Sequence, residues 1–104
     1  MNTNALIAAA RFHALAGTAA ANGGFWVSAG GGTANVVAGE IARATGAAFD
    51  EALHALDVTG GEDWYSDLAY AQPWGWNDMD AAETARWDAR IIAKAACRPV
   101  RVSA

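Results

Sequence analysis

The sequence predicts a mainly α-helical fold: a compact bundle of four or five short helices, with a small two-stranded β ribbon as an optional addition. Apolar residues recur at helical spacing in three segments, whereas only two short runs have strand character. Alanine, the strongest helix former, supplies 28 of the 104 residues. Because alanine buries little area, the five tryptophans are expected to supply much of the core. We expect one helical domain over residues 1–98 and a short tail over 99–104.

The first helix is predicted to begin near residue 4 and to continue to Leu15 or beyond. Asn2, Thr3 or Asn4 can cap it, because each side chain offers an acceptor to the free amides of the first turn. The Asn-Gly-Gly run at 22–24 is expected to end it.

The second helix is expected between Thr33, as its N-cap, and Gly46, just past its C-terminus. Glu40 and Arg43 are expected to point outward. Three apolar residues at positions i, i+4 and i+7 form the predicted inner face: Val37, Ile41 and Ala44.

The third helix is predicted to start at Asp50 as its cap and to stop at the glycines 60–61. Its inner face is expected to carry Phe49, Leu53 and Leu56. One or two further helical turns are expected between residues 62 and 71, with Trp64 in the core.

The last helix is predicted to begin with a capping box of Asp80 and Glu83 and to end before Pro99. Its inner stripe is expected to contain Thr84, Trp87, Ile91 and Ala95. The optional ribbon would pair residues 25–27 with residues 100–102, which are rich in aromatic and β-branched side chains.

Charge and cysteine content exclude several classes of protein. Seven basic and eleven acidic residues give a net charge of −4, which argues against direct nucleic-acid binding. One cysteine, Cys97, excludes an internal disulfide and a cysteine-rich zinc site. No basic leader precedes the first apolar run, and no stretch approaches the ~20 apolar residues of a membrane span. We therefore expect a cytoplasmic protein with no membrane segment and no cofactor.

Three segments resemble the DUF6197 family, small domains of unknown function found in actinobacteria, other bacteria and their phages. These segments are residues 36–46, residues 52–56, and the Trp-Asn-Asp run at 76–78 that leads into Thr84 and the final helix. The resemblance covers residues 4–96, and the run at 76–78 is its most specific part. The chain departs from the family at Val36-Val37, where a Cys-containing start is usual, and in the aromatic stretch 64–74. The resemblance implies an architecture and a phage or host context, without a catalytic residue.

The glycine turn before the second helix allows two interpretations. The backbone amides of Gly31, Gly32 and Thr33 could hold an anion at a helix N-terminus. The alternative is a glycine linker followed by a good cap, which we favour because the Gly-Lys-Ser/Thr of a phosphate-binding loop is absent.

The two histidines, His13 and His54, lack the third ligand and the short spacing of a zinc site. His54 has Asp50 and Asp57 at helical spacing, which is typical of an ordinary surface contact and only rarely of an acid–base pair. We therefore predict no metal site and no catalytic residue.

An acidic aromatic segment, residues 57–78, is the richest feature of the sequence. No Lys or Arg occurs between Glu51 and Thr84. The acids could serve solubility and helix capping, could dock on a basic partner, or could hold a metal or catalyse a reaction. Aromatic rings among acids favour a protein interface. The predicted partner-binding residues are Asp57, Glu62, Asp63, Tyr65, Asp67, Tyr70 and Trp74.

Two classes of function remain open. The first is a small acidic protein-binding module whose partner is a larger protein with a basic surface. A phage or mobile-element inhibitor of a bacterial defence complex, similar to anti-CRISPR proteins, is the specific form expected. The second is a small-molecule or nucleotide-binding domain, or a minor enzyme, that uses the glycine turn and the acidic aromatic residues. The sequence favours binding and leaves the oligomeric state open.

Overall fold

The computed structural model describes residues 2–21, 31–61, 64 and 89–98. These residues form a four-helix bundle of α1 (Thr3–Ala21), α2 (Gly31–Thr45), α3 (Phe49–Gly60) and the helical residues 89–96. No strand occurs among them, which confirms the predicted mainly α-helical fold. Both segments of the optional ribbon, 25–27 and 100–102, lie outside the described residues.

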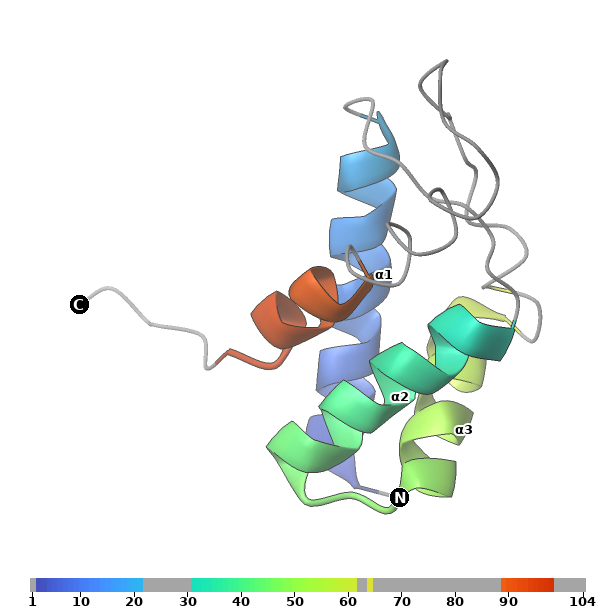
Figure 1. Cartoon of the computed structure of the whole chain (residues 1–104), viewed down its shortest axis with the longest axis vertical. Helices are drawn as coiled ribbons and strands as arrows, with labels where there is room; N and C mark the ends of the chain where they lie inside the picture. The colour runs from blue at the N-terminus through green and yellow to red at the C-terminus, as the bar shows by residue number, and fades with distance from the viewer. Residues whose placement is uncertain (1, 22–30, 62–63, 65–88, 99–104) are drawn as a thin grey trace.

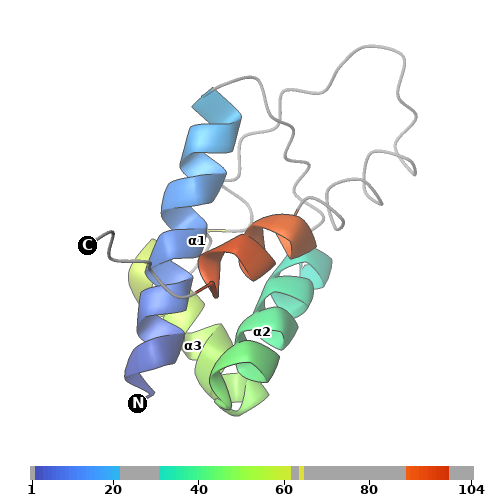
Figure 2. The same cartoon turned by 90° about the vertical axis from the view of Figure 1, so that its left-hand side faces the viewer.

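The four helices enclose one shared interior (Figure 1). α3 packs against both α1 and α2, which also touch each other. Residues 89–96 lie across α1 and α2 on the side away from α3 (Figure 2). In the described part of the chain, no helix combines the length and apolar character needed to cross a membrane.

α1 starts at a side-chain cap, because Asn2 Oδ1 accepts a hydrogen bond from the Ala5 amide at 3.2 Å. The same residue joins three helix ends. Its backbone N–H donates to Glu51 Oε1 at 2.7 Å, and its side-chain amide donates to the Thr45 carbonyl at 3.4 Å. Of the three predicted caps, Asn2 is therefore the one that the structure selects, and it ties α1 to the α2–α3 turn.

α2 begins at Gly31, so Thr33 lies in its first turn and the helix starts three residues earlier than the predicted N-cap implies. The predicted C-terminus is confirmed. Gly46 adopts a positive φ of 75°, which suits glycine, and its amide donates to the Ala42 carbonyl at 2.9 Å. Val37 and Ile41 are fully buried as predicted, but Ala44 is exposed.

α3 begins at Phe49, after Ala48, which has extended backbone and no side-chain capping bond. Asp50 is therefore not the cap; it lies in the first turn, where its charge complements the helix dipole. The inner face is also shifted from the prediction. Phe49 is 43% exposed, and the buried residues are Ala52, Ala55 and Leu56. Gly61 ends the helix with a φ of 92°, and its amide donates to the Asp57 carbonyl at 2.8 Å.

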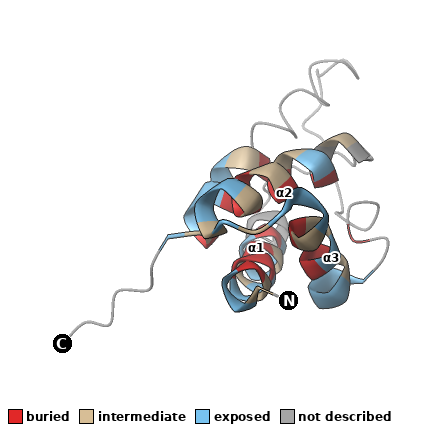
Figure 3. Ribbon diagram, turned by 90° about the horizontal axis from the view of Figure 1, so that it is seen from below, coloured by how far each residue is buried: buried red, intermediate tan, exposed pale blue. Residues whose placement is uncertain are grey.

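In the described part of the chain, the core is built mainly from alanine, and Figure 3 shows the buried residues on the helix faces that turn toward one another. Eleven of the sixteen buried hydrophobic residues in the described part are alanines, and the other five are Phe12, Val37, Ile41, Leu56 and Trp64. Small side chains let helix backbones approach closely, so much of the interior is filled by backbone and Cβ atoms. Trp64 is 3% exposed and confirms its predicted core position, whereas the other tryptophans lie outside the described residues.

The predicted stripe on the last helix is wrong at Ile91 and Ala95, the two of its residues that the structure describes. Ile91 is 62% exposed and Ala95 is exposed, while Ala89, Ala93 and Ala96 are buried. The alanine face suits close packing against α1 and α2, and the bulkier isoleucine is left in solvent. Thr84, Trp87 and the predicted capping box at 80 and 83 lie outside the described residues.

Candidate functional site

An aromatic cluster of Phe12, His13 and Trp64 joins α1 to Trp64, which lies four residues past the end of α3. The three rings meet edge to face, with centroids 5.5 Å apart for Phe12–His13, 5.6 Å for Phe12–Trp64 and 5.1 Å for His13–Trp64. This geometry places the positive edge of one ring on the negative face of another. The cluster therefore holds Trp64 against α1.

Polar contacts fix the orientation of the His13 ring. Its Nε2 lies 2.9 Å from the Leu56 carbonyl oxygen and, since a carbonyl only accepts, Nε2 carries the proton. Thr59 Oγ1 also donates to this carbonyl, at 3.3 Å. Burial lowers the pKa of the His13 imidazole, and it outweighs the opposing effects of the Leu56 hydrogen bond and the Asp57 charge. The ring thus serves as a neutral packing group.

Asp57, the first predicted partner-binding residue, has a structural contact. Its Oδ1 accepts a hydrogen bond from Trp64 Nε1 at 3.2 Å, and its side chain is half-buried. The indole N–H is a donor that needs a partner when the ring is buried. Asp57 therefore ties the Trp64 ring to α3.

Glu40 was predicted to point outward, and this prediction is wrong. Its side chain is only 10% exposed, and its Oε1 accepts a hydrogen bond from Arg90 Nε at 3.0 Å. Arg43 Nη1 approaches the same oxygen at 3.5 Å but is 70% exposed. A carboxylate can be buried when a cation compensates it, and Arg90 lies fifty positions away in the sequence. No local pattern could have revealed this pair.

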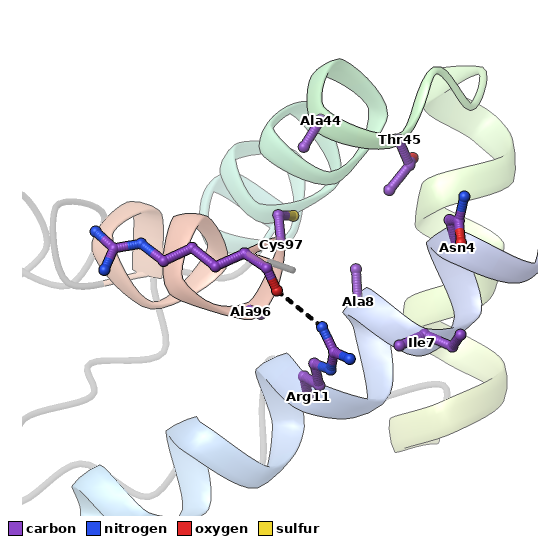
Figure 4. Close-up of a pocket in the computed structure, with 9 residues that line it drawn as sticks. Asn4, Ile7, Ala8, Arg11, Ala44, Thr45, Ala96 and Cys97 are labelled. Carbon is purple, nitrogen blue, oxygen red and sulfur yellow. Dashed lines mark hydrogen bonds between the residues drawn. The ribbon is translucent and has the colours of Figure 1, made fainter. Parts of the chain in front are cut away.

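A groove with a volume of about 330 Å³ lies where α1, α2 and residues 96–98 meet (Figure 4). We call it the Arg11 groove. Figure 4 shows Asn4, Ala8 and Arg11 along α1, with Ala44 and Thr45 of α2 and Cys97 on the other sides. The nine lining residues are Asn4, Ile7, Ala8, Arg11, Ala44, Thr45, Ala96, Cys97 and Arg98.

Two lining residues define the chemistry of the Arg11 groove. Arg11 Nη1 donates to the Arg98 carbonyl oxygen at 2.9 Å, two residues beyond the end of the last helix, and this bond restrains the guanidinium. Burial raises the pKa of the Cys97 thiol, and the charge of Glu40 adds to this effect while Arg11 opposes it. The thiol is therefore protonated at neutral pH, which makes it a polarisable wall rather than a nucleophile.

The remaining predicted residues are only partly covered by the structure. Glu62, Asp63, Tyr65, Asp67, Tyr70 and Trp74 lie outside the described residues. Gly31, Gly32 and Thr33 form the first turn of α2, and the predicted anion site there stays a prediction. His54 is exposed on α3, in agreement with its predicted surface position. Within the described ranges, no three acidic, histidine or cysteine side chains gather closely enough to hold a metal ion.

Comparisons of this chain with known protein families, with curated proteins and with solved structures found no match. Its function is therefore inferred from the chemistry of its own residues. The resemblance to DUF6197 stays a prediction.

Proposed function

We propose that this protein is a small acidic binding module whose partner is a larger protein with a basic surface. The Asp57–Trp64 hydrogen bond carries the proposal, because it fastens the beginning of the acidic aromatic segment to the bundle. After Asp57 the sequence continues through Asp63, Asp67 and Asp78 without any Lys or Arg before Arg86. An acidic surface of this kind attracts a basic partner over a distance of about a Debye length.

The aromatic residues of the segment would supply the affinity. Tyr and Trp bury a large area and keep a polar tip, which is why they dominate binding hot spots. Acids would then guide the encounter, while Tyr65, Tyr70 and Trp74 would anchor the complex. In the specific form that we propose, the partner is a basic, nucleic-acid-binding groove of a bacterial defence complex, which the module blocks in the cytoplasm of a phage-infected host.

The experiment identifies the partner by affinity capture on the full chain and then measures association and dissociation rates at low and high salt. Charge reversal of two acids, Asp63→Lys with Asp67→Lys, should slow association about 10-fold, since steering contributes factors of 10 or more. Truncation of Tyr70 or Trp74 to alanine should instead speed dissociation.

Asp50→Lys is the matched control, because Asp50 is an exposed acid on α3 outside the segment. It should change the association rate much less than the double reversal does. If the association and dissociation rates change neither with salt concentration nor with any of the four substitutions, the acidic aromatic segment does not contact the partner. A captured partner without a basic surface would also contradict the proposal.

A further inference from the structure

The Arg11 groove has the size and composition of a small-molecule site. Its volume of about 330 Å³ is at the lower end of the range typical of ligand pockets. Four lining residues are apolar, and they come from three helices: Ile7, Ala8, Ala44 and Ala96. Such sites combine an apolar lining with a few polar groups that orient the ligand.

The charge of the groove is opposite to that of the whole chain. Among the residues that the structure describes, no Asp or Glu lines it, although acids outnumber bases in the sequence by eleven to seven. Arg11 supplies its positive charge, Arg98 contributes the backbone carbonyl that accepts from Arg11, and Cys97 is a neutral thiol. The nearby carboxylate of Glu40 is paired with Arg90 and does not line the groove. A negatively charged ligand is therefore the complementary one.

The Arg11 guanidinium is suited to bind a carboxylate. A guanidinium has five N–H donors in a planar fork, and Arg11 commits Nη1 to the Arg98 carbonyl. This bond fixes the side chain, so little entropy would be lost when the other donors bind a ligand. A carboxylate matches the fork in bidentate geometry and needs a single positive charge.

We propose that the Arg11 groove binds a small monocarboxylate with a compact apolar body. The carboxylate would accept hydrogen bonds from the Arg11 guanidinium, and the body would lie against Ile7, Ala44 and the thiol of Cys97. Asn4 and Thr45 offer polar contacts at the α1–α2 end of the groove. This site does not involve the acidic aromatic segment, so either proposal can fail without the other.

Benzoate is the probe, because it joins a carboxylate to a compact apolar ring. Backbone NMR shifts of the full chain are followed during titrations with benzoate, acetate and benzamide. Benzoate should shift Arg11, Ala44 and Cys97 saturably. Acetate lacks the apolar body and benzamide lacks the charge, so both should bind about 10-fold more weakly.

Variants locate the site. Arg11→Gln should weaken benzoate binding about 10-fold, because it removes the charged fork. Ala44→Leu should fill the groove from an exposed position and weaken binding without touching the Arg11–Arg98 bond, so it tests the site even if Arg11→Gln fails to fold. Lys94→Gln is the charge-matched control, since Lys94 is exposed on the last helix and does not line the groove.

Benzoate should also slow the reaction of Cys97 with a thiol reagent, in proportion to the occupancy measured by NMR. The proposal is overturned if benzoate produces no saturable shifts at these residues, or if acetate and benzoate bind equally. It is also overturned if benzoate binds Ala44→Leu as tightly as it binds the unaltered chain.

Discussion

Glu40 Oε1 and Arg90 Nε lie 3.0 Å apart and join the middle of α2 to the last helix across fifty positions of sequence. The carboxylate is nearly buried, whereas the Arg90 side chain is 41% exposed. The pair therefore holds together two faces that otherwise meet mainly through small side chains. Its loss should loosen the docking of residues 89–96.

We expect Glu40→Ala to lower the free energy of unfolding by about 1–3 kcal/mol, because it removes a hydrogen bond between charged groups and leaves a gap. Urea unfolding followed by circular dichroism measures the change. Arg43→Ala is the control. Arg43 lies 3.5 Å from the same oxygen but is 70% exposed, so its loss should cost less than about 1 kcal/mol. Equal losses for the two variants would contradict the assigned role of Arg90.

Gly60→Ala should destabilise the protein by about 1–3 kcal/mol, because a Cβ at this position would overlap the His13 ring. The ring is held by its neighbours and by Leu56, so it cannot move without losing a contact. In a His13→Ala background, the same glycine substitution should cost much less. Thermal unfolding of the two single variants and the double variant measures this coupling.

Gly39→Ala is the matched control for that experiment. A Cβ at Gly39, inside α2, meets nothing within 4 Å. It should therefore stabilise the protein by about 0.4–1 kcal/mol through the helix preference of alanine. If both glycine variants changed the melting temperature in the same direction, the contact between Gly60 and His13 would be refuted.

The stability of the protein should fall as the pH drops below about 6.5, the ordinary pKa of histidine. Burial lowers the pKa of His13 in the folded state, so the unfolded chain binds the proton first and is stabilised relative to the folded chain. Above that pH the ring is neutral in both states, so it does not contribute to the pH dependence of the free energy of unfolding.

Unfolding in urea at a series of pH values between 5 and 8 tests this expectation. His13→Gln should remove part of the decline and retain a donor for the Leu56 carbonyl. His54→Gln, which replaces the exposed histidine of α3, should keep the decline. A decline of the same size in the His13 variant would assign it to other groups.

Asp57 allows the structural and the proposed binding roles to be separated. Asp57→Asn keeps a side-chain oxygen that can accept from Trp64 Nε1, so stability should change by less than about 0.5 kcal/mol. Asp57→Ala removes the acceptor and should cost about 1–3 kcal/mol, because the buried indole N–H loses a partner. Once the partner is identified, both Asp57 variants should bind it with a slower association rate than the unaltered chain. If the asparagine variant associates as fast as the unaltered chain, Asp57 has only its structural role.

The helix ends were largely predictable because their signals are local. Asn2 and Gly46 act where the sequence placed a cap and a stop, since capping depends on neighbouring residues. At Thr33 and Asp50 the side chain suited a cap, but the helix began one or two residues earlier. Gly30 and Ala48 stand before the first residues of these two helices in the sequence, and neither has a side chain that can cap a helix.

The helix faces were less predictable, because alanine blurs the apolar periodicity. Hydrophobic spacing predicts Ile91 in the interior, yet close helix approach favours Ala89 and Ala93 there. Contacts between residues far apart in the sequence also could not be predicted from local patterns. The burial of Glu40 depends on Arg90, and the ring position of His13 depends on the missing side chain at Gly60.

The alanine faces leave the axial register of the helices weakly specified. A surface of methyl groups has shallow ridges, so one helix can slide along another with little change in contact. We expect the bulky Phe12 and Leu56, together with the long-range hydrogen bonds of Asn2, Arg11 and Glu40, to select one alignment among these near-equivalents. These few polar links would then contribute more to the uniqueness of the fold than to its total stability.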